Sequence, residues 1–126
     1  MYYKKAILAS LILLFITITG FVSSIPGVAK NLKVLPQDIS EDKLDSFMHS
    51  YNKALDVSCD FCHAKNKEGD LDFASDENPA KEVARNMIRL TIDINKKYFN
   101  TDSTIHPAYL NIVKCYTCHK GNAYPQ

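Results

Sequence analysis

Two pentapeptides decide how this chain folds: Cys-Asp-Phe-Cys-His at residues 59–63 and Cys-Tyr-Thr-Cys-His at residues 115–119. Both read C-x-x-C-H, the pattern that attaches a c-type haem. The spacing has a chemical reason, because two thiols must bond the vinyl groups on one edge of a porphyrin and the next imidazole must reach the iron. The two copies use all four cysteines of the chain, so the sequence predicts two covalently attached haem c groups.

The haem-binding residues follow from these motifs. We expect thioether bonds at the cysteines and proximal iron ligands at the histidines, that is at Cys59, Cys62, His63, Cys115, Cys118 and His119. Two other interpretations use the same cysteines: a zinc site built from both pairs, or disulfides. Residues 63–114 separate the pairs, a much longer gap than in a zinc ribbon, and zinc requires no histidine after each second cysteine. Haem is therefore the favoured interpretation.

Length and charge limit the remaining possibilities. With 126 residues and a net charge of +1, the chain suits a single domain and lacks the basic excess typical of nucleic-acid binding. Without an N-terminal targeting segment about one hundred residues remain, and a domain of that size buries a low fraction of its surface. Bound haems would add apolar surface for side chains to pack on. We therefore expect a haem-dependent core and a poorly folded haem-free chain.

The N-terminus is predicted to be a targeting segment. Lys4 and Lys5 precede an uncharged apolar run over residues 6–22, and small-x-small sites follow at residues 22–24 and 27–29. The length of the run lies between that of a signal-peptide core and that of a membrane span. It therefore predicts either a signal peptide over residues 1–24 or a retained anchor. Both place the rest of the chain on the periplasmic side of the cytoplasmic membrane.

The exported chain is predicted to be all-α, with a linker over residues 25–39 and one dihaem domain over residues 40–126. A first helix should begin at Ser40, whose side chain can cap it, and should end near Asp56. One face of this helix is apolar and carries Leu44, Phe47, Met48, Tyr51 and Leu55.

A second helix should begin at Asn78-Pro79, a capping residue followed by proline at the first helical position, and should run to about Phe99. One apolar stripe carries Val83, Met87, Leu90, Ile94 and Tyr98, and a second carries Ile88, Ile92 and Phe99. The polar wedge between them holds Arg85, Arg89, Asp93 and Lys96. Such a helix should be sandwiched, either between two haems or between one haem and a partner. A short helix near Pro107 should lead into the second motif, and no strand pattern stands out.

The distal iron ligands carry the functional information, because methionine ligation raises the reduction potential and suits electron transfer, whereas an open position suits gas or peroxide chemistry. Met48 is the favoured distal ligand of the first haem, since it lies on the apolar face of its helix, and His49 is the less favoured rival. Met87 is favoured for the second haem. His106 and an open site are its rivals, and His106 could equally cap the helix that begins at Pro107.

The segment around the first motif, residues 52–63, resembles the haem segment of the cytochrome c subunit of photosynthetic reaction centres. Residues 72–79, residues 84–87 and the second motif with Lys120 and Gly121 are also similar to that family, so the resemblance covers residues 40–126. It implies small helix–turn–CxxCH units packed on haems, each haem parallel to the helix that carries its distal methionine. Two departures are evident: this chain has two haem motifs where the family's subunit has four, and Lys120 stands where arginine is expected.

The resulting hypothesis is a stand-alone dihaem cytochrome c and not an enzyme. It would carry single electrons between redox partner proteins, such as a membrane respiratory or photosynthetic complex and a soluble carrier or oxidase, with no small-molecule substrate. The alternative is a small haem enzyme or sensor, peroxidase-like, with one open-coordinated haem. An acidic loop could steer a basic partner or could simply be solvated; its carboxylates are Glu68, Asp70, Asp72, Asp76 and Glu77.

Overall fold

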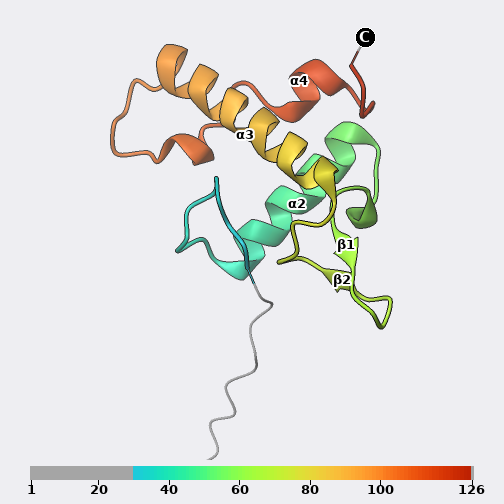
Figure 1. The fold of residues 1–126 in the computed structure, drawn as a ribbon. Helices are drawn as coiled ribbons and strands as arrows, with labels where there is room; N and C mark the ends of the chain where they lie inside the picture. The colour runs from blue at the N-terminus through green and yellow to red at the C-terminus, as the bar shows by residue number, and fades with distance from the viewer. Residues whose placement is uncertain (1–29, 126) are drawn as a thin grey trace, which may run out of the picture.

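The computed structural model describes residues 30–125. The expected targeting segment and the first part of the expected linker lie outside these residues. In chain order the elements are α2 (Glu41–Leu55), a 3-10 turn η1 (Cys59–Phe61), β1 (Ala64–Lys65), β2 (Leu71–Asp72), α3 (Pro79–Tyr98), a 3-10 turn η2 (Pro107–Tyr109) and α4 (Cys115–His119). Figure 1 shows α3 crossing over α2, with α4 beside both and the two strands at one side.

Helix α2 begins and ends where the sequence predicts. The Ser40 side chain accepts a hydrogen bond from the backbone N–H of Lys43 at 3.4 Å and caps the N-terminus. At the other end Asp56 adopts the left-handed conformation with φ 54°, which stops the helix. The first haem motif starts three residues later, so this cap determines the direction in which the motif leaves the helix.

Helix α3 also confirms its predicted start. The Asn78 side chain accepts from the N–H of Ala80 at 3.0 Å, and Pro79 occupies the first helical position. Asn78 also donates from its side chain to the carbonyl oxygen of Phe61 at 3.1 Å. The residue that caps α3 therefore also ties this helix to the turn of the first motif.

A small two-stranded hairpin is the exception to the all-α prediction. β1 pairs antiparallel with β2, with Ala64 opposite Asp72 and Lys65 opposite Leu71. Side-chain bonds from Asn66 build its turn, because the Asn66 Oδ1 accepts from the N–H of Asp70 at 2.9 Å. The hairpin depends on turn chemistry and not on a run of β-forming residues, which is why no strand pattern stood out in the sequence.

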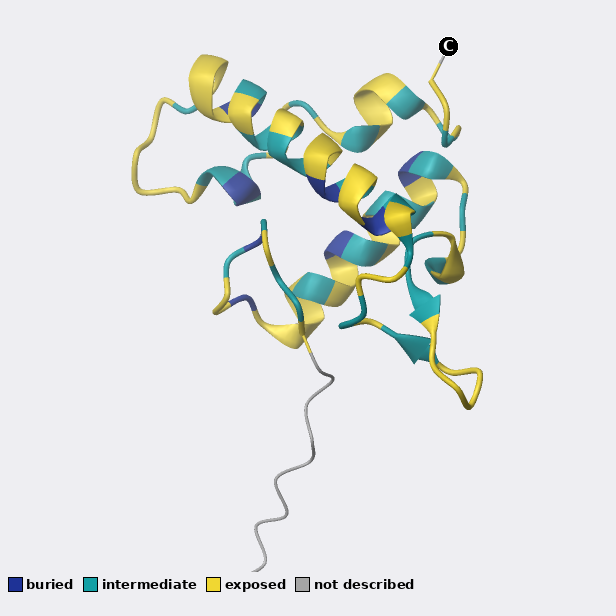
Figure 2. Cartoon of the chain, in the orientation of Figure 1, coloured by how far each residue is buried: buried dark blue, intermediate teal, exposed yellow. Residues whose placement is uncertain are grey.

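The buried core is small and includes part of the expected linker. Leu35 and Ile39 cluster with Phe47 of α2 and Ala108 of η2. Residues 30–39, named here the strap, therefore pack against the helices, as the cyan segment of Figure 1 shows. Figure 2 shows buried positions on the inner faces of the helices and in the strap, and an exposed outer face along α3. None of the helices within residues 30–125 is long and apolar enough to cross a membrane.

Candidate functional site

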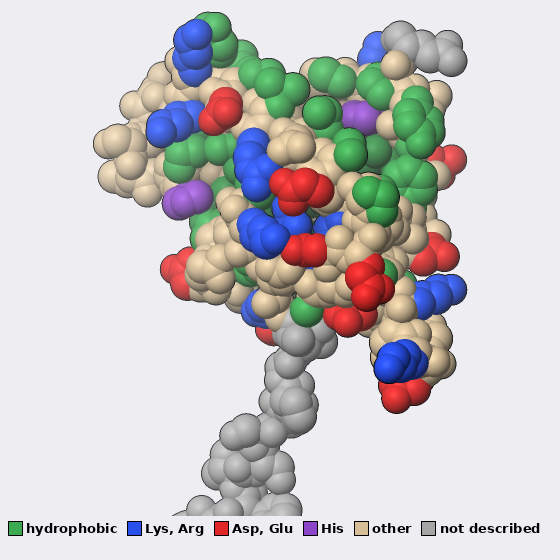
Figure 3. Space-filling model, viewed as in Figure 1, with side chains coloured by type: hydrophobic (Ala, Val, Ile, Leu, Met, Phe, Trp, Pro, Cys, Tyr) green, Lys and Arg blue, Asp and Glu red, His purple; other side chains and the backbone are tan. Residues whose placement is uncertain are grey.

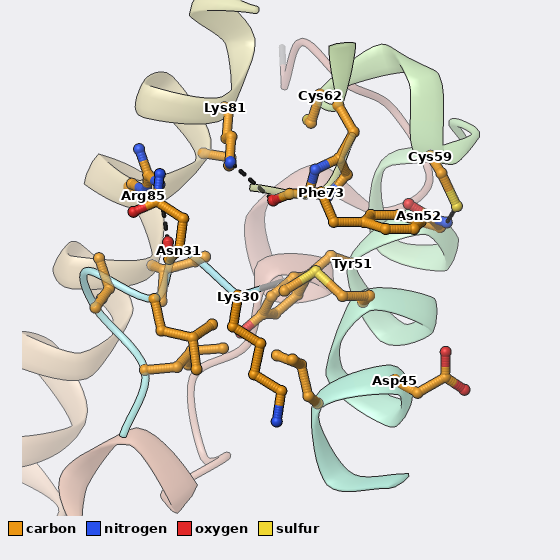
Figure 4. Close-up of a pocket in the computed structure, with 18 of the residues that line it drawn as sticks. Lys30, Asn31, Asp45, Tyr51, Asn52, Cys59, Cys62, Phe73, Lys81 and Arg85 are labelled. Carbon is orange, nitrogen blue, oxygen red and sulfur yellow. Dashed lines mark hydrogen bonds between the residues drawn. The ribbon is translucent and has the colours of Figure 1, made fainter. Parts of the chain in front are cut away.

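A cavity of about 300 Å³ opens between the strap, α2 and α3. Its volume is at the lower end of the range of about 300–1,000 Å³ that is usual for cofactor sites. Figure 4 shows Cys59 and Cys62 at one end of it, and Lys30 and Asp45 at the other end. The cavity is lined mainly by apolar side chains, among them Leu32, Val34, Leu35, Leu44, Leu55, Val57, Ala84 and Ile88.

All three residues of the first motif that are expected to bind haem line this cavity. The backbone of the motif forms a helical turn, in which the N–H of His63 donates to the carbonyl oxygen of Cys59 at 3.0 Å. One helical turn at about 100° per residue places positions i, i+3 and i+4 on one side, which brings both thiols and the imidazole together. The side chain of Asn52 on α2 donates to the sulfur of Cys59 at 3.4 Å and orients it.

The imidazole of His63 has no partner for its Nδ1 atom, although this atom is buried. The ring packs edge-on against Phe73, with 5.0 Å between the centroids. Burial lowers the pKa of His63, and the charges of Lys81 and Arg85 lower it further. A lowered pKa favours the neutral imidazole, which is the form that binds a metal.

The two candidate distal residues of this site differ in burial. Met48 is half-buried, lines the cavity and packs against the hydrophobic core. His49 borders the cavity too, but its side chain is 71% exposed and lies 3.4 Å from the carboxylate of Asp45. Two thiols, an imidazole and a thioether thus surround one apolar space, and this donor set fits a haem.

Two buried cations form another wall of the cavity, and sequence reasoning missed them. Arg85 was expected in a polar wedge, but this residue is 6% exposed and Lys81 is 8% exposed. Both pair with Asp76, at 2.9 and 3.2 Å. The helical spacing could have revealed them, because Lys81, Arg85, Ile88 and Ile92 fall on one face of α3.

Asp76 is the hub of this charge network. Its pKa lies far below the usual range, first because of the hydrogen bond from Lys33 and then because of the one from Arg85. Asp72 has an internal role as well, since its carboxylate accepts from the N–H groups of Ala74 and Ser75. Two of the five carboxylates of the expected acidic loop are therefore committed to the fold itself.

The second motif forms α4, which packs against the C-terminal half of α2. The N–H of Gly121 donates to the carbonyl oxygen of Ala54 at 2.9 Å, and Gly121 has φ +83°, a conformation that favours glycine. The Nδ1 of His119 lies 2.9 Å from the carbonyl oxygen of Asn122. A ring held through Nδ1 presents its Nε2 atom as a free ligand.

The cysteines of α4 differ in environment. Burial raises the pKa of the Cys115 thiol, whereas Cys118 is exposed. Tyr51 links the two candidate sites, because it lines the first cavity and its pKa is raised first by burial and then by the nearby Cys115. Tyr51 of α2 therefore borders the first cavity and lies near a cysteine of the second motif.

Asn95 positions the chain that enters the second motif. Its side chain is 1% exposed and donates to the carbonyl oxygens of Leu110 at 2.9 Å and Val113 at 2.8 Å. Its Oδ1 accepts from the N–H of Val113 at 2.8 Å. Three hydrogen bonds from one side chain thus link α3 to residues 110–113, a role for which the sequence offers no signal.

The outer face of α3 is apolar and exposed. Val83, Met87 and Leu90 are 59%, 42% and 52% exposed, and they lie opposite the face that carries Ile88 and Ile92. In Figure 3 hydrophobic side chains are spread over the upper half of the molecule, where α3 and α4 lie. Met87 does not line the first cavity, and its side chain is partly exposed.

His106 caps the turn that follows it, as one of the two readings of the sequence predicts. Its Nδ1 accepts from the N–H of Ala108 at 3.2 Å, and the residue is exposed. The Nδ1 atom of His106 therefore has a structural role as the cap of this turn.

The zinc and disulfide interpretations have no geometric support in residues 30–125. The four cysteines are unpaired, and no group of three or more His, Cys, Asp or Glu side chains converges there as metal ligands would. Cys59 and Cys62 line the first cavity and Cys115 and Cys118 do not, whereas a zinc site would need all four thiols within one coordination sphere.

Comparisons with known proteins agree with this geometry. A family model, the photosynthetic reaction centre cytochrome C subunit, matches residues 23–126. Cytochrome c-554 of Chloroflexus aurantiacus is 38% identical over 84 residues, 66% of this chain and 18% of that protein. The photosynthetic reaction center cytochrome c subunit of Roseobacter denitrificans is 34% identical over 101 residues, 78% of this chain and 25% of that protein. No solved structure matches the chain.

The chain spans a quarter or less of the length of these relatives. The family match nevertheless includes both C-x-x-C-H motifs, both long helices and the strap. The chain belongs to the photosynthetic reaction centre cytochrome c subunit family.

Proposed function

We propose that this protein is a dihaem c-type cytochrome that carries single electrons. One observation carries the proposal: the apolar cavity that Cys59, Cys62, His63 and Met48 line together. Membership of a cytochrome c family adds the expectation of covalently bound haem c. When bound, a haem supplies reversible one-electron chemistry at its iron.

Different residues of the first site would bind the haem and set its reduction potential. Cys59 and Cys62 would attach the haem covalently, and His63, as a neutral imidazole, and Met48 would supply ligands to its iron. Lys30 lies at the far end of the cavity from the cysteines (Figure 4), where it pairs with Glu41 and would offer a cation to the haem carboxylates. Around a bound haem the apolar lining would exclude water, which would favour outer-sphere electron transfer over reaction with a substrate.

The second site is proposed on α4, with Cys115, Cys118 and His119 as its haem-binding residues and Met87 as distal ligand. Three observations support it: His119 is held through Nδ1, Cys115 is half-buried, and the apolar stripe of α3 around Met87 is exposed. A haem on this stripe would cover apolar surface that otherwise faces water. Helix α3 would then lie between two haems.

We place this protein on the periplasmic side of the cytoplasmic membrane, where it would exchange electrons with redox partner proteins. Residues 1–24 would act as a signal peptide or as an anchor. The intact mass of the native protein distinguishes these two cases, because cleavage removes the mass of the segment and retention preserves it.

Haem content and ligand binding test the proposal. The pyridine haemochrome assay on native protein should give two haem c per chain, and replacement of Cys115 and Cys118 by alanine should halve this value. Carbon monoxide should leave the reduced spectrum unchanged, because a methionine would occupy the binding position at each iron. Prompt binding at one haem would favour the enzyme or sensor alternative, and colourless native protein would refute the cytochrome assignment.

A further inference from the structure

Lys81 and Arg85 are the only buried charged side chains in the described part of the chain. Both line the first cavity together with His63. Figure 4 shows them on α3, across the cavity from Cys59. At the second motif the lysines that flank α4, Lys114 and Lys120, are exposed, so water and salt screen their charges.

The network around these cations has a net positive charge. Its cations are Lys33, Lys81, Arg85 and Arg89, and its carboxylates are Asp76 and Glu82, which leaves a charge of +2. Three of the four cations line the cavity, but neither carboxylate does. Figure 3 shows basic and acidic side chains gathered in the middle of one face.

The protein itself uses the hydrogen-bonding capacity of both buried cations. The ammonium of Lys81 has three donors, and its three partners are the carbonyl oxygens of Phe73 and Ser75 and the carboxylate of Asp76. Arg85 donates to the carbonyl oxygen of Asn31 at 3.1 Å and also pairs with both carboxylates of the network. These side chains are therefore held as fixed charges and act on the cavity through their field.

We propose that this network raises the reduction potential of the first haem and makes it the higher-potential haem of the two. The physical reason is that the oxidised form carries one more positive charge than the reduced form, so a fixed buried cation disfavours oxidation. The inference rests on the proposed function. Through their charges, Lys81 and Arg85 would make electron transfer from the second haem to the first haem favourable.

Substitutions of opposite sign test the proposal in the complete haem-loaded protein. Arg85→Gln removes a cation and should lower the potential of the first haem, changing the ratio of oxidised to reduced haem at a fixed applied potential about tenfold, or about 59 mV for one electron. Asp76→Asn removes a carboxylate and should raise the same potential by a similar factor. Arg85→Lys should restore most of the loss.

The control is Arg89→Gln. Arg89 pairs with Glu82 on the same helix but does not line the cavity, so the change in ratio should stay below about twofold. If Arg85→Gln yields no haem-loaded protein, the nearly isosteric Asp76→Asn variant still tests the direction of the shift in reduction potential. The Met48→Ala variant identifies which redox wave belongs to the first haem. The wave that it shifts should be the same wave that Arg85→Gln and Asp76→Asn shift.

Haem content is measured first, so a failure of the proposed function is distinguished from a failure of this inference. Opposite shifts of the higher-potential wave by Arg85→Gln and Asp76→Asn would support the network as an electrostatic device. Shifts in the same direction, no shift, a shift of the lower-potential wave, or a shift of the wave that Met48→Ala leaves in place would overturn it. A purely structural role predicts shifts in one direction, because both substitutions would loosen the same wall.

Discussion

The surroundings of single side chains at the first cavity suit the iron ligation that we propose there. Burial and two nearby cations favour the neutral form of His63, and Met48 reaches the same apolar space from α2. The neighbouring residue, His49, lies mostly in water. At this scale the choice between methionine and histidine is a matter of which face of α2 borders the cavity.

Replacing Met48 should therefore change one haem and spare the other. Met48→Ala removes the proposed distal ligand, and axial ligands set haem potentials over a range of about 0.8 V, so we expect that potential to fall by on the order of 100 mV. A spectroelectrochemical titration of both waves measures the effect, with His49→Ala as the control that should move neither. Unchanged potentials in Met48→Ala would rule out this ligand.

Asp76 should make the stability of the protein depend on pH in acid. Its pKa in the folded protein lies below the unfolded value of about 3.9, so its contribution is complete above about pH 4 and is lost as the pH falls toward the folded value. Urea unfolding at pH 7 and pH 3 should show a smaller loss of unfolding free energy in Asp76→Asn than in the unmodified protein. Equal losses in the two proteins would contradict this linkage.

At the scale of elements, short connections position the motifs more than long-range packing does. Asp56 ends α2 in a left-handed conformation just before the first motif, and Gly121 ties the end of the second motif to Ala54. Asn78 starts α3 and holds the turn of the first motif. Helix α3 thus has one face on the first cavity and an exposed apolar face opposite to it, where we propose the second site.

Asn95 is the element-scale contact whose loss should be most costly. Asn95→Ala would leave the backbone groups of Leu110 and Val113 without partners, and unsatisfied buried polar groups cost about 1–3 kcal/mol each. We expect the unfolding free energy of the haem-loaded protein to fall by about 3 kcal/mol in urea titrations. Asn111→Ala is the matched control, since Asn111 is exposed and makes a single bond to Tyr109. Similar losses in the two variants would show that Asn95 is not a special anchor.

At the scale of the whole molecule, the described residues bury few apolar side chains: Leu35, Ile39, Phe47, Ala54 and Ala108. Large apolar residues such as Val83, Leu90 and Tyr98 remain exposed along α3. A protein core usually supplies the largest favourable contribution to folding. Because so few apolar side chains are buried, we expect the apolar surfaces of bound haems to complete the core.

The haem-free chain should therefore unfold without cooperativity. Replacing all four cysteines by alanine prevents covalent attachment, and thermal unfolding followed by circular dichroism should show a broad, shallow transition. The haem-loaded protein should show a sharp transition under the same conditions. A sharp transition in the haem-free variant would mean that the core is sufficient without the cofactor.

The sequence predicted the parts of the fold that local chemistry determines. The capping residues Ser40 and Asn78 and the apolar periodicity of the helices set the bounds of α2 and α3. The hairpin could not be foreseen, because Asn66 builds it through bonds to its own loop. The packing of the strap was equally hidden, since Leu35 and Ile39 show no helical or strand period and gain their partners from distant elements.

By itself, the sequence determined the chemistry of this protein: two C-x-x-C-H motifs, a methionine on an apolar helical face, and the helices that carry them. These features depend on spacing along the chain. Only the tertiary structure decided which groups surround each motif, because Lys33, Asp76 and Arg85 come from three different segments and meet only when these segments pack together. The interaction energy of such an ion pair depends on the distance between charges that lie far apart in the sequence, and local sequence patterns do not determine this distance.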